Sequence, residues 1–571
     1  MFRFRNKRGE RTARARAARR TSHPARRPHA WDSFGRANAA AGRKRARSAA
    51  AARQAAWGPG SQTASFGLAV SLAALGACLL LLPRSALGSN GAAPIGFGAK
   101  ATGRAGAGTA VADDAIAAAL NPAVLTEIAQ IRLDASVGIL ASRYRFKNLL
   151  NDELVQSYDT FIPAFGFSWD PTGEPVKPGP EAFERGGRFR LGFQLFAPLG
   201  GGGSQKFRTE VFPNGERESL SFFALGLGPS AALRALDWLS VGVGFHLYMV
   251  SVGMEGLVGT NANSSGMVFL YRDPAGNPIL PPRPVIVEGQ QATFADLFTQ
   301  VGTSDTNQSS RLELSSATGL GFGGVIGLLA TPLPNIAFGL SYRFEGRVPR
   351  LSGDCELDAT QAVAAINNDP DFARFGGALF QAYLPNGGSH GFKADYDFEL
   401  EDLRVPAVLS AGVAFWPHPR FLLALDLRWI RWSTAFSSQP VTLSNGSNED
   451  INAINGADRL RDENLLDWDD QFVVAVGASV LVSEGVVVRA GYNYGNNPIP
   501  ATTLTPTTGF LEHHVALGVG FYVGAFDIDL SYVYALPRTE AVDRSKVHPA
   551  FDGLSVRAEQ HFVYLGGSFS F

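Results

Sequence analysis

Few residues of this 571-residue chain have the types and spacing that catalysis or metal binding requires. The only adjacent histidines, His513 and His514, lie in an alternating apolar segment. Neighbouring strand residues point to opposite faces, so these two imidazoles cannot easily share a metal ion. The run GLGFGG at Gly319 to Gly324 resembles a nucleotide-binding loop, but it lies in a predicted strand and no helix follows it. Nucleophile elbows and zinc-spaced histidines do not occur in 89–571. We therefore expect no catalytic residue, no metal site and no cofactor, with a hydrolase left as the alternative.

The elements that would position any site are strands. The chain has 64 Gly and 40 Phe, a composition that favours strands and turns over helices. In RFRLGFQLFA, apolar side chains from Phe189 to Leu195 occupy every second position, and Arg190 and Gln194 fall on the other face. The segments FLLALDLRW, VVVRAGYNY and FDIDLSYVY repeat this pattern. Such strands have one apolar and one polar face.

The number and spacing of these strands favour a closed membrane barrel over a soluble sandwich, which would also alternate. From the fifth strand onward, short connections alternate strictly with long ones, as in an outer-membrane barrel. The longest connections are 251–317 and 346–393, and one strand is predicted to bend at Pro406. The chain also ends on an alternating aromatic strand, VYLGGSFSF. The fourteen predicted strands lie near 131–146, 160–170, 187–198, 218–228, 238–250, 318–329, 335–345, 394–416, 420–431, 470–481, 486–494, 512–522, 526–535 and 560–571.

The first 88 residues differ from the rest of the chain. Residues 1–60 hold 17 Lys and Arg against two Asp and Glu, in a low-complexity leader. This leader could be a nucleic-acid arm, but an over-long signal n-region or a start codon placed too early fits its position better. Residues 61–88 are predicted to be a secretory signal peptide cut near Gly88. The alternatives are a single membrane-spanning helix or lipidation at Cys78. We expect no nucleic-acid partner.

Both long connections carry apolar side chains that a solvated loop does not need. In 251–317, Phe294, Leu297 and Phe298 share one face of a predicted helix. An apolar surface of this kind must pack against something or bind something, and both can hold at once. The corresponding apolar residues of 346–393 are Phe372, Phe375, Leu379 and Phe380.

The segment before the first strand resembles a known family. GFGAKATGRAGAGTAVADDAIAAALNPAVL contains Asp113 and Asp114 followed by Asn121, Pro122 and Ala123. In this order, ahead of fourteen strands, it resembles the N-terminal plug of the FadL-like outer-membrane transporters of long-chain fatty acids and other hydrophobic compounds. The predicted fold is therefore an all-β transmembrane antiparallel barrel of 131–571 with a small plug, 89–130, inside it. The alanine-rich stretch before Pro122 is expected to be a helix that ends there, because a residue preceding proline resists the helical region.

The resemblance implies a function, a location and a site. It implies a monomer in the bacterial outer membrane, surrounded by lipid and lipopolysaccharide, that takes up a long-chain fatty acid or hydrocarbon by passive diffusion and releases it sideways. The two long loops would catch the ligand, and the five plug residues named above would form the gate. Inward arginines Arg343, Arg428 and Arg489 could bind a carboxylate head group, although salt-bridged packing in the lumen is the competing role. The alternative is a secretion- or assembly-associated barrel that binds protein partners.

Overall fold

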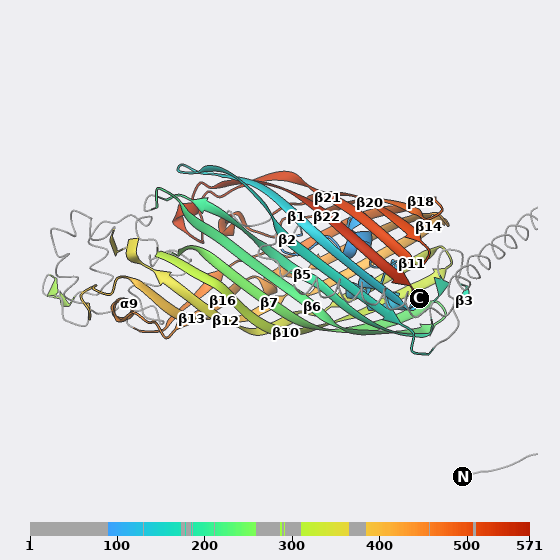
Figure 1. Cartoon of the computed structure of the whole chain (residues 1–571), viewed down its shortest axis with the longest axis horizontal. Helices are drawn as coiled ribbons and strands as arrows, with labels where there is room; N and C mark the ends of the chain where they lie inside the picture. The colour runs from blue at the N-terminus through green and yellow to red at the C-terminus, as the bar shows by residue number, and fades with distance from the viewer. Residues whose placement is uncertain are drawn as a thin grey trace, which may run out of the picture. The chain divides into compact units, whose positions relative to one another are not determined.

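The wall of the protein is one antiparallel sheet that closes on itself (Figure 1). The computed structural model describes residues 90–128, 131–172, 177–178, 184–185, 187–209, 212–258, 286–287, 290–291, 310–361, 363–364, 384–455, 457–505 and 510–570. The leader and the predicted signal peptide lie outside these residues. The last wall strand pairs with the first from Arg132↔Ser570 to Lys147↔Ser555, which closes the barrel.

The sheet contains eighteen segments, of which four consecutive pairs each form one interrupted wall strand. This gives the fourteen strands that the sequence predicts. The uninterrupted strands are β1 (Arg132–Lys147), β2 (Asp152–Trp169), β5 (Phe189–Phe207), β6 (Glu216–Leu236), β7 (Leu239–Val258), β10 (Ser310–Leu333), β19 (Val486–Gly495), β20 (His513–Val523), β21 (Phe526–Ala541) and β22 (Ser555–Ser570). The interrupted strands are β11 (Ile336–Arg343) with β12 (Gly346–Asp358), β13 (Lys393–Val405) with β14 (Val408–His418), β15 (Phe421–Ile430) with β16 (Ser438–Ser444), and β17 (Leu460–Leu465) with β18 (Gln471–Ser483).

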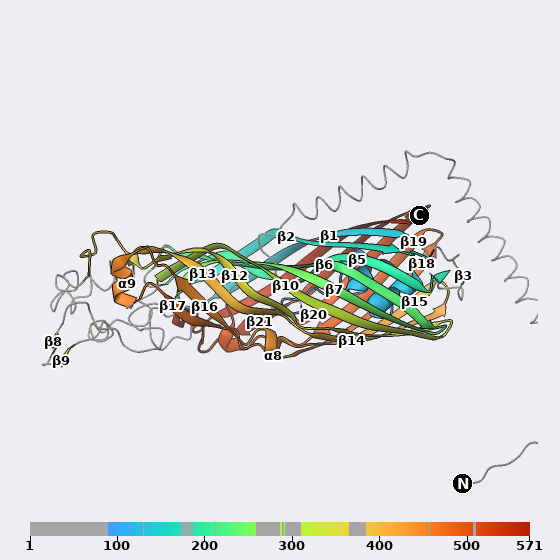
Figure 2. The same cartoon turned by 90° about the horizontal axis from the view of Figure 1, so that it is seen from below.

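Short elements complete the fold. Figures 1 and 2 show α9 at the end of the barrel opposite the C-terminus. No helix in the described part of the chain is long and apolar enough to span a membrane. The short elements are α3 (Gly98–Gly103), η1 (Ile116–Ala119), η2 (Pro122–Glu127), α8 (Trp432–Ala435), α9 (Glu449–Asn455), η4 (Ala501–Thr503), η5 (Pro549–Phe551) and the two-residue strands β3 (Lys177–Pro178), β4 (Glu184–Arg185), β8 (Ile286–Val287) and β9 (Gln290–Gln291).

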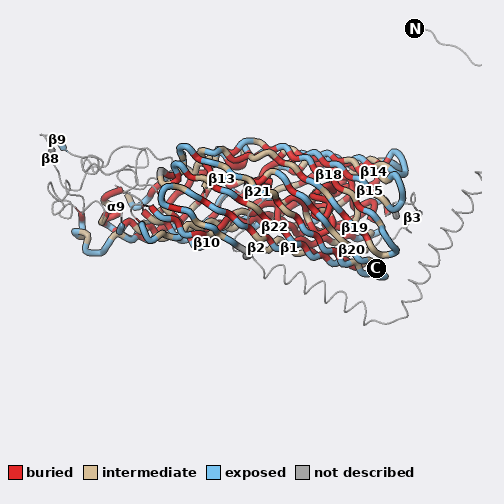
Figure 3. Tube along the Cα trace, turned by 90° about the horizontal axis from the view of Figure 1, so that it is seen from above, coloured by how far each residue is buried: buried red, intermediate tan, exposed pale blue. Residues whose placement is uncertain are grey.

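The wall around the C-terminal end has apolar side chains outside, whereas inside it has polar and charged side chains interspersed with small apolar ones such as Ala475. On β18, Phe472, Val474 and Val476 are exposed, whereas Gln471 is fully buried. Inward Asp426 is also buried. Figure 3 shows this alternation of buried and exposed positions along the strands. Water would disfavour so continuous an apolar outer surface, so hydrocarbon must surround this part of the wall.

Towards the other end the polarity of the two faces is reversed. On β13, Tyr396 and Phe398 are buried inside, and Asp395 and Asp397 are exposed outside. On β10, Leu312 is buried in the same way. The half of the barrel away from the C-terminus, called the outer half below, is therefore surrounded by water and encloses an apolar lumen.

The strands extend further into the long connections than the sequence predicts. β7 runs to Val258 and β10 begins at Ser310, so the first connection is shorter than 251–317. β12, β16 and β17 occupy residues that the prediction assigned to loops. The bend at Pro406 is confirmed, since β13 ends just before it and β14 begins just after it.

Candidate functional site

Residues 90–128, called the plug below, are buried against the inward face of the wall near the C-terminal end (Figure 1). The wall approaches the plug so closely that a side chain would not fit at several positions. An added Cβ would lie 2.3–2.6 Å from plug atoms at Gly166, Gly242, Gly339, Gly477 and Gly491. These glycines let distant parts of the wall touch the plug backbone.

The alanine-rich part of the plug is not the helix that the sequence predicts. It forms only one 3₁₀ turn, η1, and a second 3₁₀ segment begins at Pro122. Asn121 between them is extended, with φ −142° and ψ 101°, as expected before a proline. The difference arises because close wall contacts and side-chain hydrogen bonds, rather than alanine's helix propensity, determine this backbone.

The Asn-Pro-Ala motif fixes the plug to the wall. Asn121 Nδ2 donates to the carbonyl oxygens of Thr109 at 2.8 Å and of Leu328 on β10 at 3.0 Å. Its Oδ1 accepts the backbone N–H of Ala123 at 3.1 Å, which caps η2. One side chain thus joins two plug segments to a wall strand.

A second attachment is made by Asp426 and Arg428 of β15. The Asp426 carboxylate accepts the backbone N–H groups of Gly108 and Thr109 at 3.0 Å each, and the Thr109 hydroxyl at 2.6 Å. Arg428 donates to the carbonyl oxygen of Ile95 at 2.9 Å and to a second plug carbonyl. The predicted carboxylate-binding residue Arg428 therefore already has acceptors inside the protein.

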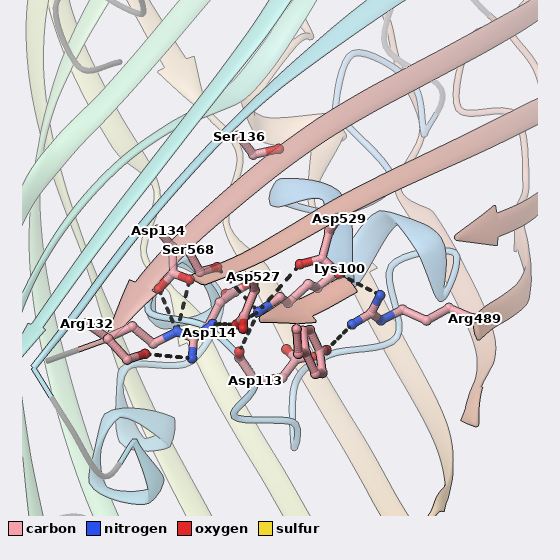
Figure 4. A network of polar contacts seen from close by, with 12 residues as sticks. Lys100, Asp113, Asp114, Arg132, Asp134, Ser136, Arg489, Asp527, Asp529 and Ser568 are labelled. Atoms are coloured by element: carbon pink, nitrogen blue, oxygen red, sulfur yellow. Dashed lines mark hydrogen bonds and ion pairs between the residues drawn. The ribbon is translucent and has the colours of Figure 1, made fainter. Parts of the chain in front are cut away.

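A third attachment is the ionic network drawn in Figure 4. Lys100 of α3 lies 3.2 Å from Asp527 and 3.6 Å from Asp529 of β21. Arg489 of β19 contacts Asp529 at 2.7 Å, and Arg132 of β1 contacts Asp527 at 2.7 Å. Arg489, a second predicted carboxylate-binding residue, is thus part of an ionic network that joins the plug to three wall strands.

The neighbouring plug carboxyls Asp113 and Asp114 have opposite environments. Burial alone would raise the pKa of Asp113, but the Arg104 guanidinium, 2.6 Å away, outweighs this and holds the pKa well below its usual range. Burial raises the pKa of Asp114 to about 7, assisted by the negative charges of Asp113 and Asp134. Asp114 Oδ1 accepts the backbone N–H of Ala117 at 2.9 Å. One carboxyl is held ionised and the other titrates near neutral pH.

Arg343 is the predicted arginine that differs from the other two. Its side chain projects inward from β11, is buried, and makes no hydrogen bond or ion pair with any residue that the structure describes. Its side chain lines a cavity of about 30 Å³ together with Asn90, Ser341 and Ser410, called the arginine cavity below. The Asn90 Oδ1 also has no partner among the described residues. A buried charge without a counterion is costly, so this cavity favours an anionic group.

Aromatic rings fill part of the lumen beyond the plug. The Trp432 ring of α8 lies 5.1 Å from both Phe436 and Trp468, and the Phe436 ring lies 5.8 Å from Phe222 of β6. The plug reaches this cluster at Gly91, where an added Cβ would lie 3.1 Å from the Trp432 ring. The first residues of the plug therefore contact the aromatic cluster and also line the arginine cavity.

The wall is not fully paired next to this cavity. The ladder between β2 and β5 ends at Ala164↔Phe196, although β5 continues for 11 more residues. At Gly200 the β5 backbone N–H instead donates to a carbonyl oxygen of the plug, that of Ala92, at 2.8 Å. The nearby Pro198 lines the arginine cavity. A segment of the plug thus covers an unpaired strand edge.

A closed fourteen-strand barrel with an apolar outer belt defines an outer-membrane β-barrel protein. Residues 89–570 match the family described as outer membrane protein transport protein (OMPP1/FadL/TodX). The chain belongs to this family, which consists of hydrophobic-compound transporters of the outer membrane rather than enzymes.

Solved structures share this fold at low sequence identity. The chain is similar to the Pseudomonas putida toluene transporter TodX, with 18% identity, a TM-score of 0.58, and coverage of 86% of this chain and 100% of that one. It is similar to the Ralstonia pickettii toluene transporter TbuX at 17% identity and a TM-score of 0.55, with coverage of 84% of this chain and 99% of that one. It is similar to a FadL homologue from Pseudomonas aeruginosa at 16% identity and a TM-score of 0.57, with coverage of 84% of this chain and 100% of that one. A comparison with curated proteins finds no match.

The structure brings together some of the predicted site residues and not others. The plug residues and the three arginines all line or contact the lumen near the plug, as described above. The unpaired β5 edge was missed, although the run of four glycines beginning at Gly200 was a signal for it. The part of the chain that the structure describes contains no group of three or more His, Cys, Asp or Glu placed to hold a metal ion. The loop residues Phe294, Leu297, Phe298, Phe372, Phe375, Leu379 and Phe380 lie outside the described residues.

Proposed function

We propose that this protein takes up long-chain fatty acids across the outer membrane by passive diffusion. Two observations carry the proposal: the inward face of the outer half of the barrel is apolar, and Arg343 is buried beside a cavity without a counterion among the described residues. An acyl chain gains about 0.8 kcal/mol for each CH₂ group that leaves water, so entry into this lumen needs no energy input. The carboxylate of the same molecule would supply the negative counterion that the Arg343 guanidinium lacks.

The apolar residues of the two long loops would make the first contact with the ligand. Phe294, Leu297 and Phe298 in one loop, with Phe372 and Phe380 in the other, would provide an apolar surface. Capture there would concentrate the ligand before it enters the barrel.

Release would be sideways into the membrane. The plug is held to the wall at Asn121, Asp426 and Lys100, so it closes the floor of the barrel. The unpaired edge of β5, by contrast, is covered through the hydrogen bond from Gly200 to Ala92. Withdrawal of the plug's first residues would open a route between β2 and β5 to the lipid-facing surface. In this scheme the plug is the gate, and the Asn-Pro-Ala motif is its fixed end.

Neutral hydrocarbons are the competing cargo, because two of the similar solved structures are named as toluene transporters. Arg343 argues for an acid, since a neutral molecule would leave its charge uncompensated. The test compares uptake of labelled oleate and of the neutral octadecene by cells that carry or lack the gene. Lipids that co-purify with the barrel are identified by mass spectrometry.

The sharper arm of the test uses Arg343→Met, with Arg347→Met as control. Arg347 is near in the sequence, and its side chain is 72% exposed. Arg343→Met should lower oleate uptake about tenfold and leave octadecene uptake within about twofold, because only the acid loses a charge-assisted hydrogen bond. Equal uptake with and without the gene, and no bound lipid, would end the transporter proposal. Co-purified protein in place of lipid would support the alternative barrel that binds protein partners.

A further inference from the structure

The outward face of β1 changes from apolar to basic at one height. The outward residues from Leu133 to Ala141 are apolar, and the next outward residue is Arg143. This apolar run covers about nine residues, the length that a tilted strand needs to cross the hydrocarbon of a bilayer. The basic residues therefore begin at the level of the outer-leaflet head groups. Together with a neighbour on β22 they form the basic patch, which consists of Arg143, Arg145, Lys147 and Arg557.

Aromatic side chains on the adjoining strands mark the same boundary. The Tyr532 hydroxyl lies 2.7 Å from His561 Nδ1, and the Tyr534 ring stacks on the same imidazole at 4.9 Å. Along β22, His561 lies between the exposed apolar Val563 and the basic Arg557. Side chains with an apolar body and a polar tip are typical of the membrane–water boundary.

The strand register places like charges beside each other in this patch. Arg145 on β1 lies directly opposite Arg557 on β22, and like charges that face each other across strands are destabilising. Arg145 contacts Asp152 at 2.7 Å, and Arg143 contacts Glu559 at 3.3 Å. The Arg557 side chain makes no hydrogen bond or ion pair within the described part of the chain. The patch therefore keeps a positive charge that its own carboxylates do not balance, and an anion bound there would relieve the repulsion.

The surface here is concave and only partly polar. A cavity of about 350 Å³ is lined by Arg143, Arg145 and Arg557 together with Leu154 and Glu559. Leu154 is half exposed, beside the guanidinium groups. Guanidinium groups bind phosphate through paired N–H donors, and the apolar belt below them can pack against acyl chains. The ligand that fits both features is a phosphorylated lipid whose head group is held above its chains.

We propose that the basic patch binds the phosphate groups of lipid A, the membrane anchor of lipopolysaccharide. The patch lies on the outer face of the wall, and so this binding does not depend on which cargo the lumen carries. The opposite side of the barrel provides a contrast, because its outward residues Glu356, Asp395 and Asp397 are acidic. Lys393, among these carboxylates, contacts Glu356 at 2.9 Å and is not expected to bind phosphate.

The test measures binding of lipid A with two phosphates to the folded, detergent-purified barrel by native mass spectrometry. Each arginine near an anionic lipid surface is worth about a fivefold change in affinity, so R145Q/R557Q should bind about 25-fold more weakly than the unmodified protein. The matched control R350Q/K393Q changes two similarly exposed cations, with side chains 59% and 58% exposed, on the acidic side. It should bind within about twofold of the unmodified protein.

Two further binding measurements test which chemical groups of the lipid the patch recognises. Dephosphorylated lipid A should bind the unmodified protein as weakly as lipid A binds R145Q/R557Q, a comparison that does not depend on how well the variant folds. Phosphatidylglycerol, with one phosphate, should bind more weakly than lipid A. Unchanged binding of lipid A by R145Q/R557Q would overturn the proposal, as would equal binding of phosphatidylglycerol or of dephosphorylated lipid A.

Discussion

At the residue scale, two adjacent carboxyls of the plug show how position decides ionisation. Arg104 stabilises the charged form of Asp113, whereas burial and two neighbouring carboxylates disfavour the charged form of Asp114. Asp114 nevertheless holds the first turn of η1 through the Ala117 N–H. Its protonation therefore affects how firmly this part of the plug is held.

The raised pKa of Asp114 predicts that the local stability of the plug around this residue depends on pH. Because its folded pKa is about 7 and its ordinary value is 3.8, its contribution to stability is complete below about pH 4 and is lost as pH rises through 7. Local opening of residues 109–120 should increase by at most about tenfold per pH unit between about pH 4.5 and 6.5. Hydrogen–deuterium exchange, corrected for the intrinsic rate, measures this. In Asp114→Asn the pH dependence should disappear.

Other groups do not mask this effect. Asp113, whose pKa is lowered, contributes stability that is lost only as pH falls below about 4, outside the measured window. The charged groups facing Asp114 are Asp113, Asp134, Lys100 and Arg132. A corrected exchange rate that is as pH-dependent in Asp114→Asn as in the unmodified protein would contradict the assignment.

The sequence predicts which face an arginine occupies, but not what that arginine contacts. Alternation alone places Arg343, Arg428 and Arg489 inside the barrel, and the structure confirms it. Their partners depend on how far along the strand each lies and on where the plug chain passes. Arg428 meets plug carbonyl oxygens and Arg489 meets Asp529, whereas Arg343 lies beside a cavity. A single sequence contains no direct record of these distances between strands and plug.

At the element scale, the plug is positioned by absent side chains as much as by present ones. At Gly327 of β10 an added Cβ would lie 2.0 Å from Asn121 Oδ1 and 3.0 Å from the Pro122 ring. The start of η2 can therefore rest on the strand only because this wall position has no side chain. The close approach also allows the Asn121 amide to reach the Leu328 carbonyl oxygen.

This contact predicts that Gly327→Ala displaces η2 from the wall. The methyl group would push Asn121 away and disrupt the hydrogen bonds of its amide, at a cost of about 1–3 kcal/mol. Exchange of backbone amides in 121–128 should become at least about tenfold faster. Gly567→Ala is the matched control, because an added Cβ at Gly567 would meet nothing within 4 Å. Equal protection in the two variants would argue against the role given to Gly327.

Strands could be predicted from the sequence wherever apolar and polar residues alternated without interruption. The strand cores alternate regularly, and all fourteen were found from the sequence. β12, the second segment of one of these fourteen strands, was missed because the strand is interrupted at Phe344 and Glu345. In addition, Pro349 and Arg350 are consecutive outward residues that break the period of two. The η1 turn was predicted as a longer helix because alanine favours a helix, whereas contacts with the wall determine the backbone there. Tertiary contacts of this kind are not visible in local sequence.

At the scale of the whole molecule, the barrel has two halves with opposite polarity. The half near the C-terminus has an apolar exterior and a polar lumen filled by the plug. The other half has a polar exterior and an apolar lumen. A hydrophobic ligand that enters from the apolar lumen therefore meets a polar floor, and the ionic network around Lys100 ties that floor to β1, β19 and β21.

This arrangement predicts that loosening the network makes the barrel leak. Lys100→Met keeps the approximate volume but leaves Asp527 and Asp529 with one cation fewer, and breaking a buried ion pair costs about 3–5 kcal/mol. The plug should then detach from β21, so that the variant conducts ions in planar lipid bilayers and sensitises cells to vancomycin. Arg350→Met is the control, because its pair with Glu399 is exposed and such pairs contribute about 0–1 kcal/mol. Ion conductance in Lys100→Met no greater than in Arg350→Met would mean that the network does not hold the floor closed, and that the attachments at Asn121 and Asp426 suffice.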